Sequence, residues 1–209
     1  MHIIDITSEL TLPSGIFPGD PIATVSEERR ISSGDPFNTS LISCGTHSGT
    51  HLDVPFHFVE EGAKLSSVGL DELCGRVYVV EIAHDGPITN EMLASKGISA
   101  SANRLLLKTS RDGLNTTGAT HIDHQGLSIS GATWVVNNGT TLLGLESYNI
   151  ESQDTPDFPV HHLLLSQNIL ILEGLELDQV QEGWYTLFCL PLKLGEVDGA
   201  PVRAVLLAD

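Results

Sequence analysis

Short runs of β-branched residues and leucine recur along the chain, and Gly, Pro, Asn or Asp bounds them. Such runs are typical of β-strands, because branched side chains suit a pleated sheet and the bounding residues favour turns. Helical signals are fewer and lie between the strand signals, so the pattern predicts a mixed α/β fold with a substantial β core. The predicted strands are 2–6, 23–28, 39–44, 77–82, 104–109, 142–145, 169–173, 185–190 and 203–207.

Three segments carry helical signals, namely 90–95, 131–138 and 160–167. The first follows Thr89, a good N-cap residue. The third follows Asp157 as cap and Pro159 as an early-turn proline. The second is ambiguous, because Ser130 would cap a helix while its Trp-Val-Val run also suits a strand.

Length and charge restrict the class of protein. The 209 residues show no internal repeat and no linker, so a single domain over 1–209 is expected. Ten Lys and Arg residues against 27 Asp and Glu give a net charge of −17 at pH 7. Nucleic acids and anionic membranes both require clustered cations, so neither is expected as a partner.

Cysteine usage and the N-terminal residues bear on location. Cys44, Cys74 and Cys189 form no Cys-x-x-Cys pair and are predicted to be buried thiols in a reducing compartment. The first residues lack a basic region followed by an apolar core, so no signal peptide is expected. No run approaches the ~18 apolar residues of a membrane-spanning helix. We therefore expect a cytoplasmic protein.

One segment concentrates groups that bind metals. Its candidates, all within eleven residues, are His47, His51, Asp53 and His57. Imidazole nitrogens and carboxylate oxygens are the usual ligands of zinc and manganese. In a straight strand His47 and His51 would lie about 13 Å apart. A bend is therefore expected at 48–50, where a glycine tolerates unusual backbone angles.

A second segment, 158–175, is predicted to form a helix, a short turn and a buried strand. Glu173 ends the apolar strand, and a buried carboxylate is costly unless it is paired or binds a metal. A helix of about seven residues advances ~10 Å, and a returning strand of about five advances ~16 Å. The end of the strand would then come back beside His161 at the start of the helix.

The run His-x3-His-x-Asp-x-Pro-x-His resembles the signature of the metal-dependent cyclase-like hydrolases, which include bacterial kynurenine formamidase. The resemblance covers nearly the whole chain, with weaker motifs in the expected order at 17–21, 158–161, 173–175, 190–193 and 199–203. It implies a swivelling β/β/α domain with a β-barrel-like core, in agreement with the strand-rich pattern. It also implies a homodimer or homotetramer.

The resemblance further implies a centre of two divalent metal ions, zinc or alternatively manganese. By position in the motif, His47, His51 and Asp53 would hold one ion. His161 and Glu173 would complete the second, with Asp53 and Glu173 shared between the two ions.

Two further residues match functional positions of the family. His57 matches the catalytic histidine, and Phe17 matches an aromatic position of the substrate pocket, although ordinary packing also accounts for Phe17. Two divalent ions lower the pKa of water towards ~7 and stabilise an oxyanion at an attacked carbonyl. His57 would take a proton from the attacking water and deliver it to the leaving nitrogen.

These features predict a metal-dependent hydrolase of a carboxamide C–N bond. The leading hypothesis is an arylformamidase of tryptophan catabolism that converts N-formylkynurenine to kynurenine and formate through hydroxide attack. A cyclic amide such as isatin is the alternative substrate. A non-catalytic metal-binding protein is the alternative of another class, and a structural metal site would be closed rather than open to a ligand.

The remaining histidines leave questions open. His162 is either a residue of the helix surface or a hydrogen-bond donor behind a ligand. His121 and His124 form a metal-like triplet with Asp123, but their polar neighbours favour a loop at the surface or at the edge of the pocket. Cys44 has no base beside it in the sequence, which favours an inert thiol over a nucleophile.

Overall fold

The computed structural model describes residues 2–10, 20–82, 86–109, 126–152 and 157–208. Its strands are β1 (His2–Asp5), β2 (Thr24–Arg29), β3 (Thr39–Ser43), β4 (His51–Asp53), β5 (Cys74–Ile82), β6 (Arg104–Thr109), β7 (Leu142–Leu145), β8 (Leu170–Glu173), β9 (Gly183–Pro191) and β10 (Gly199–Ala208). Its α-helices are α1 (Leu70–Leu73), α2 (Asn90–Ser95), α3 (Ile129–Asn137) and α4 (Pro159–Ser166). Short 3₁₀ helices cover Ile31–Ser33, Pro55–His57 and Leu65–Ser67.

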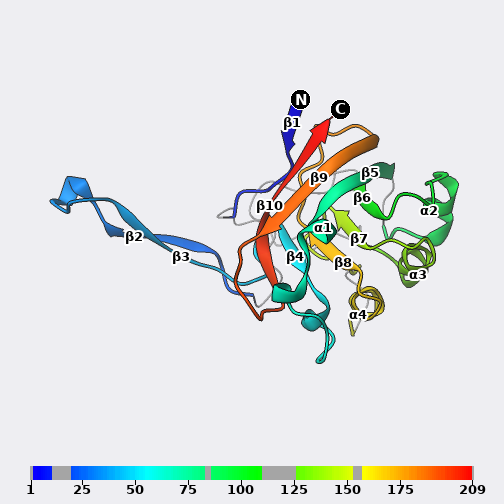
Figure 1. Ribbon diagram of the computed structural model, residues 1–209, viewed down its shortest axis with the longest axis horizontal. Helices are drawn as coiled ribbons and strands as arrows, with labels where there is room; N and C mark the ends of the chain where they lie inside the picture. The colour runs from blue at the N-terminus through cyan, green and yellow to red at the C-terminus, as the bar shows by residue number, and fades with distance from the viewer. Residues whose placement is uncertain (1, 11–19, 83–85, 110–125, 153–156, 209) are drawn as a thin grey trace.

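Seven of these strands close into a barrel. Their order is β10–β4–β8–β7–β6–β5–β9, and β9 pairs back with β10 to complete the circuit. Strand β1 pairs antiparallel with β10 outside the circuit, so the two ends of the chain lie side by side (Figure 1). The predicted mixed α/β fold with a barrel-like core is confirmed.

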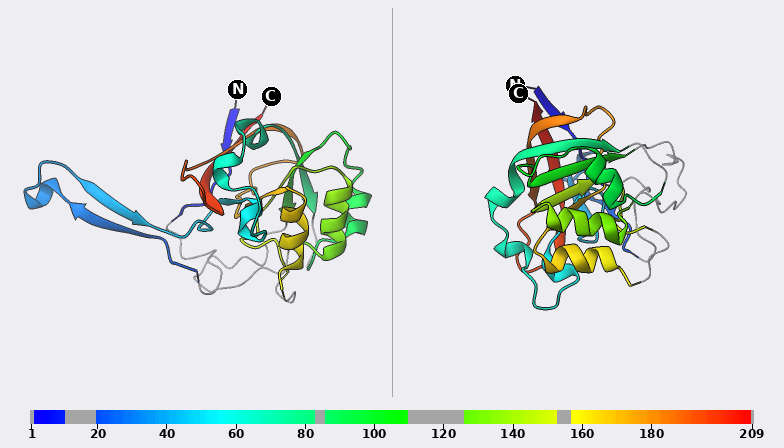
Figure 2. Two further views of the ribbon diagram at one scale, coloured as in Figure 1. Left: turned by 60° about the horizontal axis from the view of Figure 1, so that its bottom comes forward. Right: turned by 90° about the vertical axis from the view of Figure 1, so that its right-hand side faces the viewer.

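Half of the barrel is parallel and is covered by helices. Strands β5, β6, β7 and β8 pair in parallel, and α2, α3 and α4 lie in the connections between them, on one side of the barrel (Figure 2). Leu106 packs into the barrel interior, whereas Leu105 and Leu107 pack in a second apolar cluster that includes helix residues. Burial on both faces explains why such strands read as unbroken apolar runs.

The ends of two helices differ from the predicted ones. The ambiguous segment is the helix α3, but Ser128 caps it by accepting a hydrogen bond from Gly131 N at 3.2 Å. The predicted cap, Ser130, instead accepts from Asn90 N in α2. The N-cap of α4 is Phe158 rather than Asp157.

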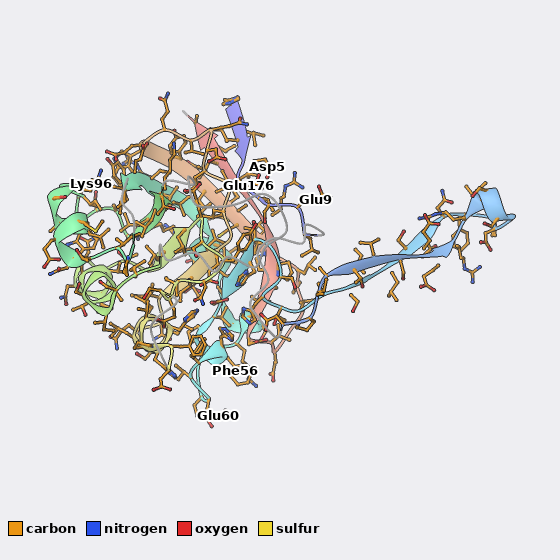
Figure 3. The ribbon with its side chains drawn as sticks, turned by 180° about the vertical axis from the view of Figure 1, so that it is seen from behind. Asp5, Glu9, Phe56, Glu60, Lys96 and Glu176 are labelled. Carbon is orange, nitrogen blue, oxygen red and sulfur yellow. The ribbon has the colours of Figure 1, made fainter. Side chains whose placement is uncertain are left out.

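Strands β2 and β3 lie outside the barrel. They pair only with each other among the described strands and form an arm that projects away from the body (Figure 1). Side chains stand in solvent on both sides of the arm (Figure 3), and every residue of the two strands is exposed. The predicted strands 23–28 and 39–44 are thus strands, but they contribute nothing to the core.

Two further features concern the burial of the cysteines and the length of the helices. Cys189 is buried, but Cys44 and Cys74 are only partly buried, so the prediction of three buried thiols is wrong for two of them. Cys44 lies just after the exposed strand β3, which explains its accessibility. No helix in the described part of the chain is long and apolar enough to cross a membrane.

Candidate functional site

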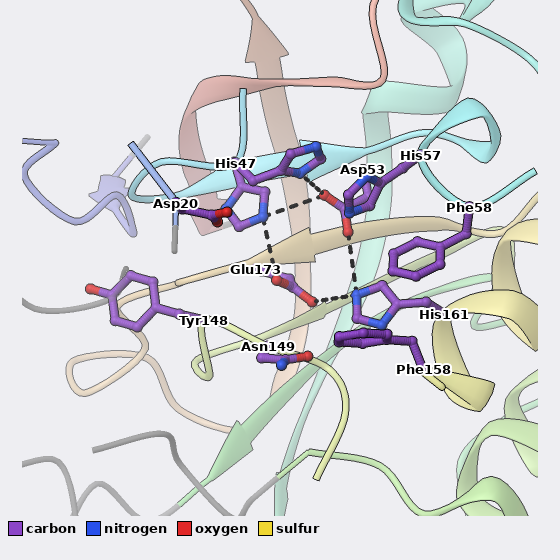
Figure 4. Close-up of a pocket in the computed structure, with 11 residues that line it drawn as sticks. Asp20, His47, Asp53, His57, Phe58, Tyr148, Asn149, Phe158, His161 and Glu173 are labelled. Carbon is purple, nitrogen blue, oxygen red and sulfur yellow. Dashed lines mark hydrogen bonds and ion pairs between the residues drawn. The ribbon is translucent and has the colours of Figure 1, made fainter. Parts of the chain in front are cut away.

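A pocket of about 220 Å³ opens where β4 and β8 meet the start of α4 (Figure 4). All six candidate residues that lie in the described part of the chain line it, whereas Phe17 falls outside the described residues. The lining residues are Asp20, His47, His51, Asp53, His57, Phe58, Tyr148, Asn149, Phe158, His161 and Glu173.

Pairing of β4 with β8 brings together the side chains of His51, Asp53 and Glu173. His51 and Asp53 point to the same face of β4, while Leu52 between them points into the barrel core. The antiparallel register places His51 opposite Glu173, the last residue of β8. His51 Nε2 then lies 3.3 Å from Asp53 Oδ1 and 3.3 Å from Glu173 Oε2.

A sharp bend brings His47 to the same cluster. Gly49 has a φ of 65°, and a Cβ there would lie 3.3 Å from Leu10 Cδ1, so both backbone angle and space favour glycine. The predicted bend at 48–50 is confirmed. His47 Nδ1 consequently lies 2.7 Å from Asp53 Oδ1.

The helix–turn–strand segment places His161 beside Asp53 and Glu173. It sits in the first turn of α4, buried, with Nε2 3.7 Å from Asp53 Oδ2 and 3.5 Å from Glu173 Oε1. The expectation that the end of β8 returns beside the start of α4 is confirmed. His162 is exposed, packs in a T-shaped arrangement with the ring of Phe58, and does not line the pocket.

His57 occupies a different position from the other histidines. It ends a 3₁₀ helix, stacks on the ring of His47 at 3.8 Å between centroids, and lies 3.6 Å from Asp198 Oδ2 through Nδ1. One ligand atom each from His47, Asp53 and His57 fall within 4.8 Å of one another. His57 therefore has the geometry of either a ligand or a proton carrier.

Opposite charges set the protonation of the buried histidines. Burial favours the neutral form of His51, but hydrogen bonds and charges from Asp53 and Glu173 outweigh it and hold its pKa well above 6.5. His161 behaves in the same way, with burial opposed by the nearby carboxylates, and its pKa is raised to about 9. The pKa of Glu173 falls to about 2, because the histidines outweigh burial and the charge of Asp53.

The proton affinity of His57 moves the other way. Burial lowers its pKa below 6.5, and the positive charges of His47 and His161 add to that effect. The attraction of Asp53 and Asp198 does not compensate. His57 is therefore neutral at pH 7 and able to accept a proton.

The donor set fits divalent metal ions. Oδ2 of Asp53 is buried and accepts no hydrogen bond, a costly state for a carboxylate oxygen that a cation would relieve. Three imidazoles and two carboxylates around it form the nitrogen and oxygen environment that zinc and manganese prefer. One ligand atom each from His51, Asp53 and Glu173 also fall within 4.8 Å of one another.

Several residues of the site were not predicted from the sequence. Asp198 Oδ2 lies 2.8 Å from His47 Nε2, and Glu151 Oε1 lies 3.3 Å from His161 Nδ1. Asp198 directly precedes the motif at 199–203, which offered a signal, whereas no motif marks Glu151. The other unpredicted residues line the pocket and are Asp20, Phe58, Tyr148, Asn149 and Phe158. The triplet with His121 and His124 lies outside the described residues.

Solved structures share the whole fold. A structure described as a potential metal-dependent hydrolase with cyclase activity superposes with a TM-score of 0.83 at 27% identity, covering 98% of this chain and 96% of that chain. An isatin hydrolase bound to the product analogue thioisatinate superposes with a TM-score of 0.85 at 20% identity, covering 99% and 92%. At that identity the second likeness concerns the fold alone.

Sequence comparison gives a more specific result. The kynurenine formamidase of Salinibacter ruber (strain DSM 13855 / M31) is 32% identical over 207 residues, which cover 99% of this chain and 97% of that protein. The model of the Cyclase family ("Putative cyclase") matches residues 4–152, more than half of the chain. The chain therefore belongs to the cyclase family, as its histidine run predicts.

Proposed function

We propose that this amide hydrolase uses two divalent metal ions and converts N-formylkynurenine to kynurenine and formate. The single observation that carries the proposal is the buried Asp53 oxygen that accepts no hydrogen bond, inside a cluster of histidines and carboxylates that lines a pocket. The similarity to kynurenine formamidases over the full length of the chain supports the substrate.

The ligands divide into two groups. His47, His51 and Asp53 would hold one ion, and His161 with Glu173 would complete the other, with the two carboxylates shared. We propose zinc, with manganese as the alternative, because both accept such nitrogen and oxygen ligands. When bound, the ions would lower the pKa of water and stabilise negative charge on the attacked carbonyl oxygen.

His57 would move the proton. Its pKa lies below 6.5, mainly because it is buried, so the neutral ring can take a proton from the attacking water. The hydroxide oxygen joins the formyl carbon, the C–N bond breaks, and the aryl nitrogen receives the proton from His57. The products are the free aryl amine and formic acid, and the acid releases its proton to solvent to become formate.

Aromatic side chains on the wall of the pocket favour an aryl substrate. Phe58 and Phe158 lie 5.5 Å apart between ring centroids, and Tyr148 stands across the pocket in Figure 4. Phe58 also stacks on the ring of His161 at 4.6 Å, which places it beside the proposed metal ligands. An aryl ring held there would bring its formamide towards the cluster.

The test is hydrolysis of N-formylkynurenine and isatin by the purified protein, before chelation, after chelation, and after zinc or manganese is restored. Chelator-sensitive turnover of N-formylkynurenine with kcat/KM above roughly 10⁴ M⁻¹s⁻¹ would support the proposal. Turnover of isatin alone would keep the chemistry and overturn the substrate. Metal binding without turnover of either compound would favour a non-catalytic metal-binding protein.

We also propose that the protein assembles as a homodimer or homotetramer through the arm of β2 and β3. An isolated two-stranded hairpin is only marginally stable in water. Twelve large hydrophobic residues in the described part of the chain are exposed, and six lie in the arm: Ile22, Val25, Ile31, Phe37, Leu41 and Ile42. A second copy of the chain would cover this apolar surface.

Sedimentation velocity tests the assembly. We expect the wild-type protein to sediment as an oligomer and the double variant Val25→Thr, Ile42→Thr to shift towards a monomer, because these two residues are paired on one face of the arm. A wild-type monomer at micromolar concentration would refute the assembly. An oligomer unaffected by the double variant would place the interface elsewhere.

A further inference from the structure

Each histidine among the proposed metal ligands makes a contact through both of its ring nitrogens. One ring nitrogen faces the shared carboxylates, and the other meets an oxygen outside the cluster. The outer oxygens belong to the Gly49 carbonyl for His51, the Asp198 carboxylate for His47 and the Glu151 carboxylate for His161. An imidazole can present a lone pair inward only when its proton lies on the outer nitrogen, so these contacts select a tautomer.

A single carboxylate oxygen of Glu151 accepts several hydrogen bonds at the start of α4. Its Oε1 accepts hydrogen bonds from Val160 N at 2.7 Å, from His161 N at 2.9 Å and from His161 Nδ1 at 3.3 Å. The residue is buried, with 1% of its surface exposed. The same oxygen thus holds both the backbone and the ring of His161.

The structure of the connection before α4 explains why the carboxylate of Glu151 takes this position. The N-cap residue of α4 is Phe158, whose side chain offers no hydrogen-bond acceptor to the first N–H groups of the helix. Glu151, earlier in the same connection from β7 to α4, supplies that acceptor, and its negative charge is favourable at the positive end of the helix. Asn149 Oδ1 fixes Glu151 in turn by accepting from its backbone N at 2.8 Å.

We infer that Glu151 is a positioning residue, which caps α4 and directs Nε2 of His161 towards Asp53 and Glu173. The inference rests on the proposed metal-dependent function and adds the residue that prepares one half of the centre. Nε2 lies 3.5 Å from Glu173 Oε1 and 3.7 Å from Asp53 Oδ2, while Nδ1 faces Glu151. Without the outer carboxylate, the ring of His161 would be free to carry its proton on Nε2 or to rotate.

Glu151→Gln tests the inference with the smallest change. The amide oxygen can still accept the three hydrogen bonds, but the negative charge that favours a proton on Nδ1 is gone. Metal-free protein is titrated with cobalt, and binding is followed by visible absorption and by the number of ions bound. We expect the affinity of one of two ions to fall 10- to 100-fold, the usual effect of losing such a partner.

Asp198→Asn is the matched variant for the other half of the centre. It removes the charge behind His47 and leaves Glu151 and His161 untouched. We expect it to lower the affinity for the other ion, so that the double variant binds both ions more weakly. Equal cobalt affinities for Glu151→Gln and wild type would overturn the positioning role. Failure of the wild-type protein to bind any metal would instead refute the proposed function.

A measurement on the wild-type protein keeps the inference testable if the Gln variant does not fold. Nitrogen-15 NMR of histidine-labelled, zinc-loaded protein reports which ring nitrogen of His161 carries the proton, and His161→Gln assigns the signal. We expect a proton on Nδ1 and none on Nε2. A proton on Nε2 would overturn the inference, whatever the variants do.

Discussion

The rings of His47 and His57 stack with 3.8 Å between centroids and 22° between planes, and one oxygen of Asp198 faces both. A histidine with a carboxylate on each side, His47, is thus packed against a histidine that burial keeps neutral. The stack places a proton acceptor directly beside a proposed metal ligand. Under the proposed roles, one ring of the stack would bind metal and the other would carry the proton.

Replacing His57 should abolish turnover without removing metal. For His57→Ala we expect kcat to fall by about 10²- to 10⁴-fold, the usual contribution of a positioned acid–base group. Steady-state kinetics and metal analysis of the same preparation check this. His162→Ala is the control, since His162 also contacts Phe58 but does not line the pocket. Loss of metal in His57→Ala would show that His57 is a ligand.

The metal-free protein should lose stability as pH rises from 6.5 to 9. The folded state raises the pKa of His161 from 6.5 to about 9, so it binds a proton more tightly than the unfolded chain does. The resulting stabilisation is complete below pH 6.5 and is lost as pH passes through 9. Urea unfolding across this range measures it, and His161→Gln should reduce the slope of the profile while leaving the part that His51 contributes. A wild-type slope no steeper than that of the variant would contradict the pKa shift of His161.

Adding metal should stabilise the protein strongly. A ligand that binds only the folded state at 100 times its Kd adds about 2.7 kcal/mol. Neutral imidazoles are needed for binding, so the gain from zinc should grow as pH rises, opposite to the trend of the metal-free protein. Thermal melting with zinc and with chelator at pH 6.5 and 8 tests both statements. An unchanged Tm would argue against a metal centre.

Gly49→Ala should disturb the site as well as the fold. A residue with a φ of 65° is strained when it carries a side chain, at a cost of about 1–2 kcal/mol. Its Cβ would also press on Leu10 and move the segment that carries His47. Gly139→Ala is the control, since its φ is 73° but nothing lies within 4 Å of the added atom. We expect both variants to lose unfolding free energy, Gly49→Ala by more because of the contact with Leu10, and metal affinity to fall only in Gly49→Ala.

Patterns local in sequence predicted the site better than its surroundings. The spacing of His47, His51 and Asp53 required a bend and one strand face, and both are present because these constraints act within seven residues. Glu151 was beyond reach, since its function depends on a loop meeting the start of α4. The cap of that helix was mispredicted for the same reason, because the carboxylate of Glu151 rather than that of Asp157 accepts from the first N–H groups of the helix.

The strand pattern predicted strands in both the barrel and the arm, but it did not predict that the arm would be exposed. Leu105 to Leu107 are apolar on both faces because sheet and helices cover them. Val25 and Ile42 read like any other strand residues in the sequence, yet both are exposed. A β-branched composition indicates an extended backbone, whereas burial depends on whether another part of the molecule packs against the strand.

The two ends of the arm meet at its base. A Cβ on Gly45 would lie 3.5 Å from Pro21 Cδ, and the flanking residues Asp20 and His47 both line the pocket. The arm is therefore a detour that leaves the barrel and returns to nearly the same point. Excising it would leave the chain path around the sheet unbroken, because the arm shares no strand pairing with the barrel that carries the proposed metal ligands.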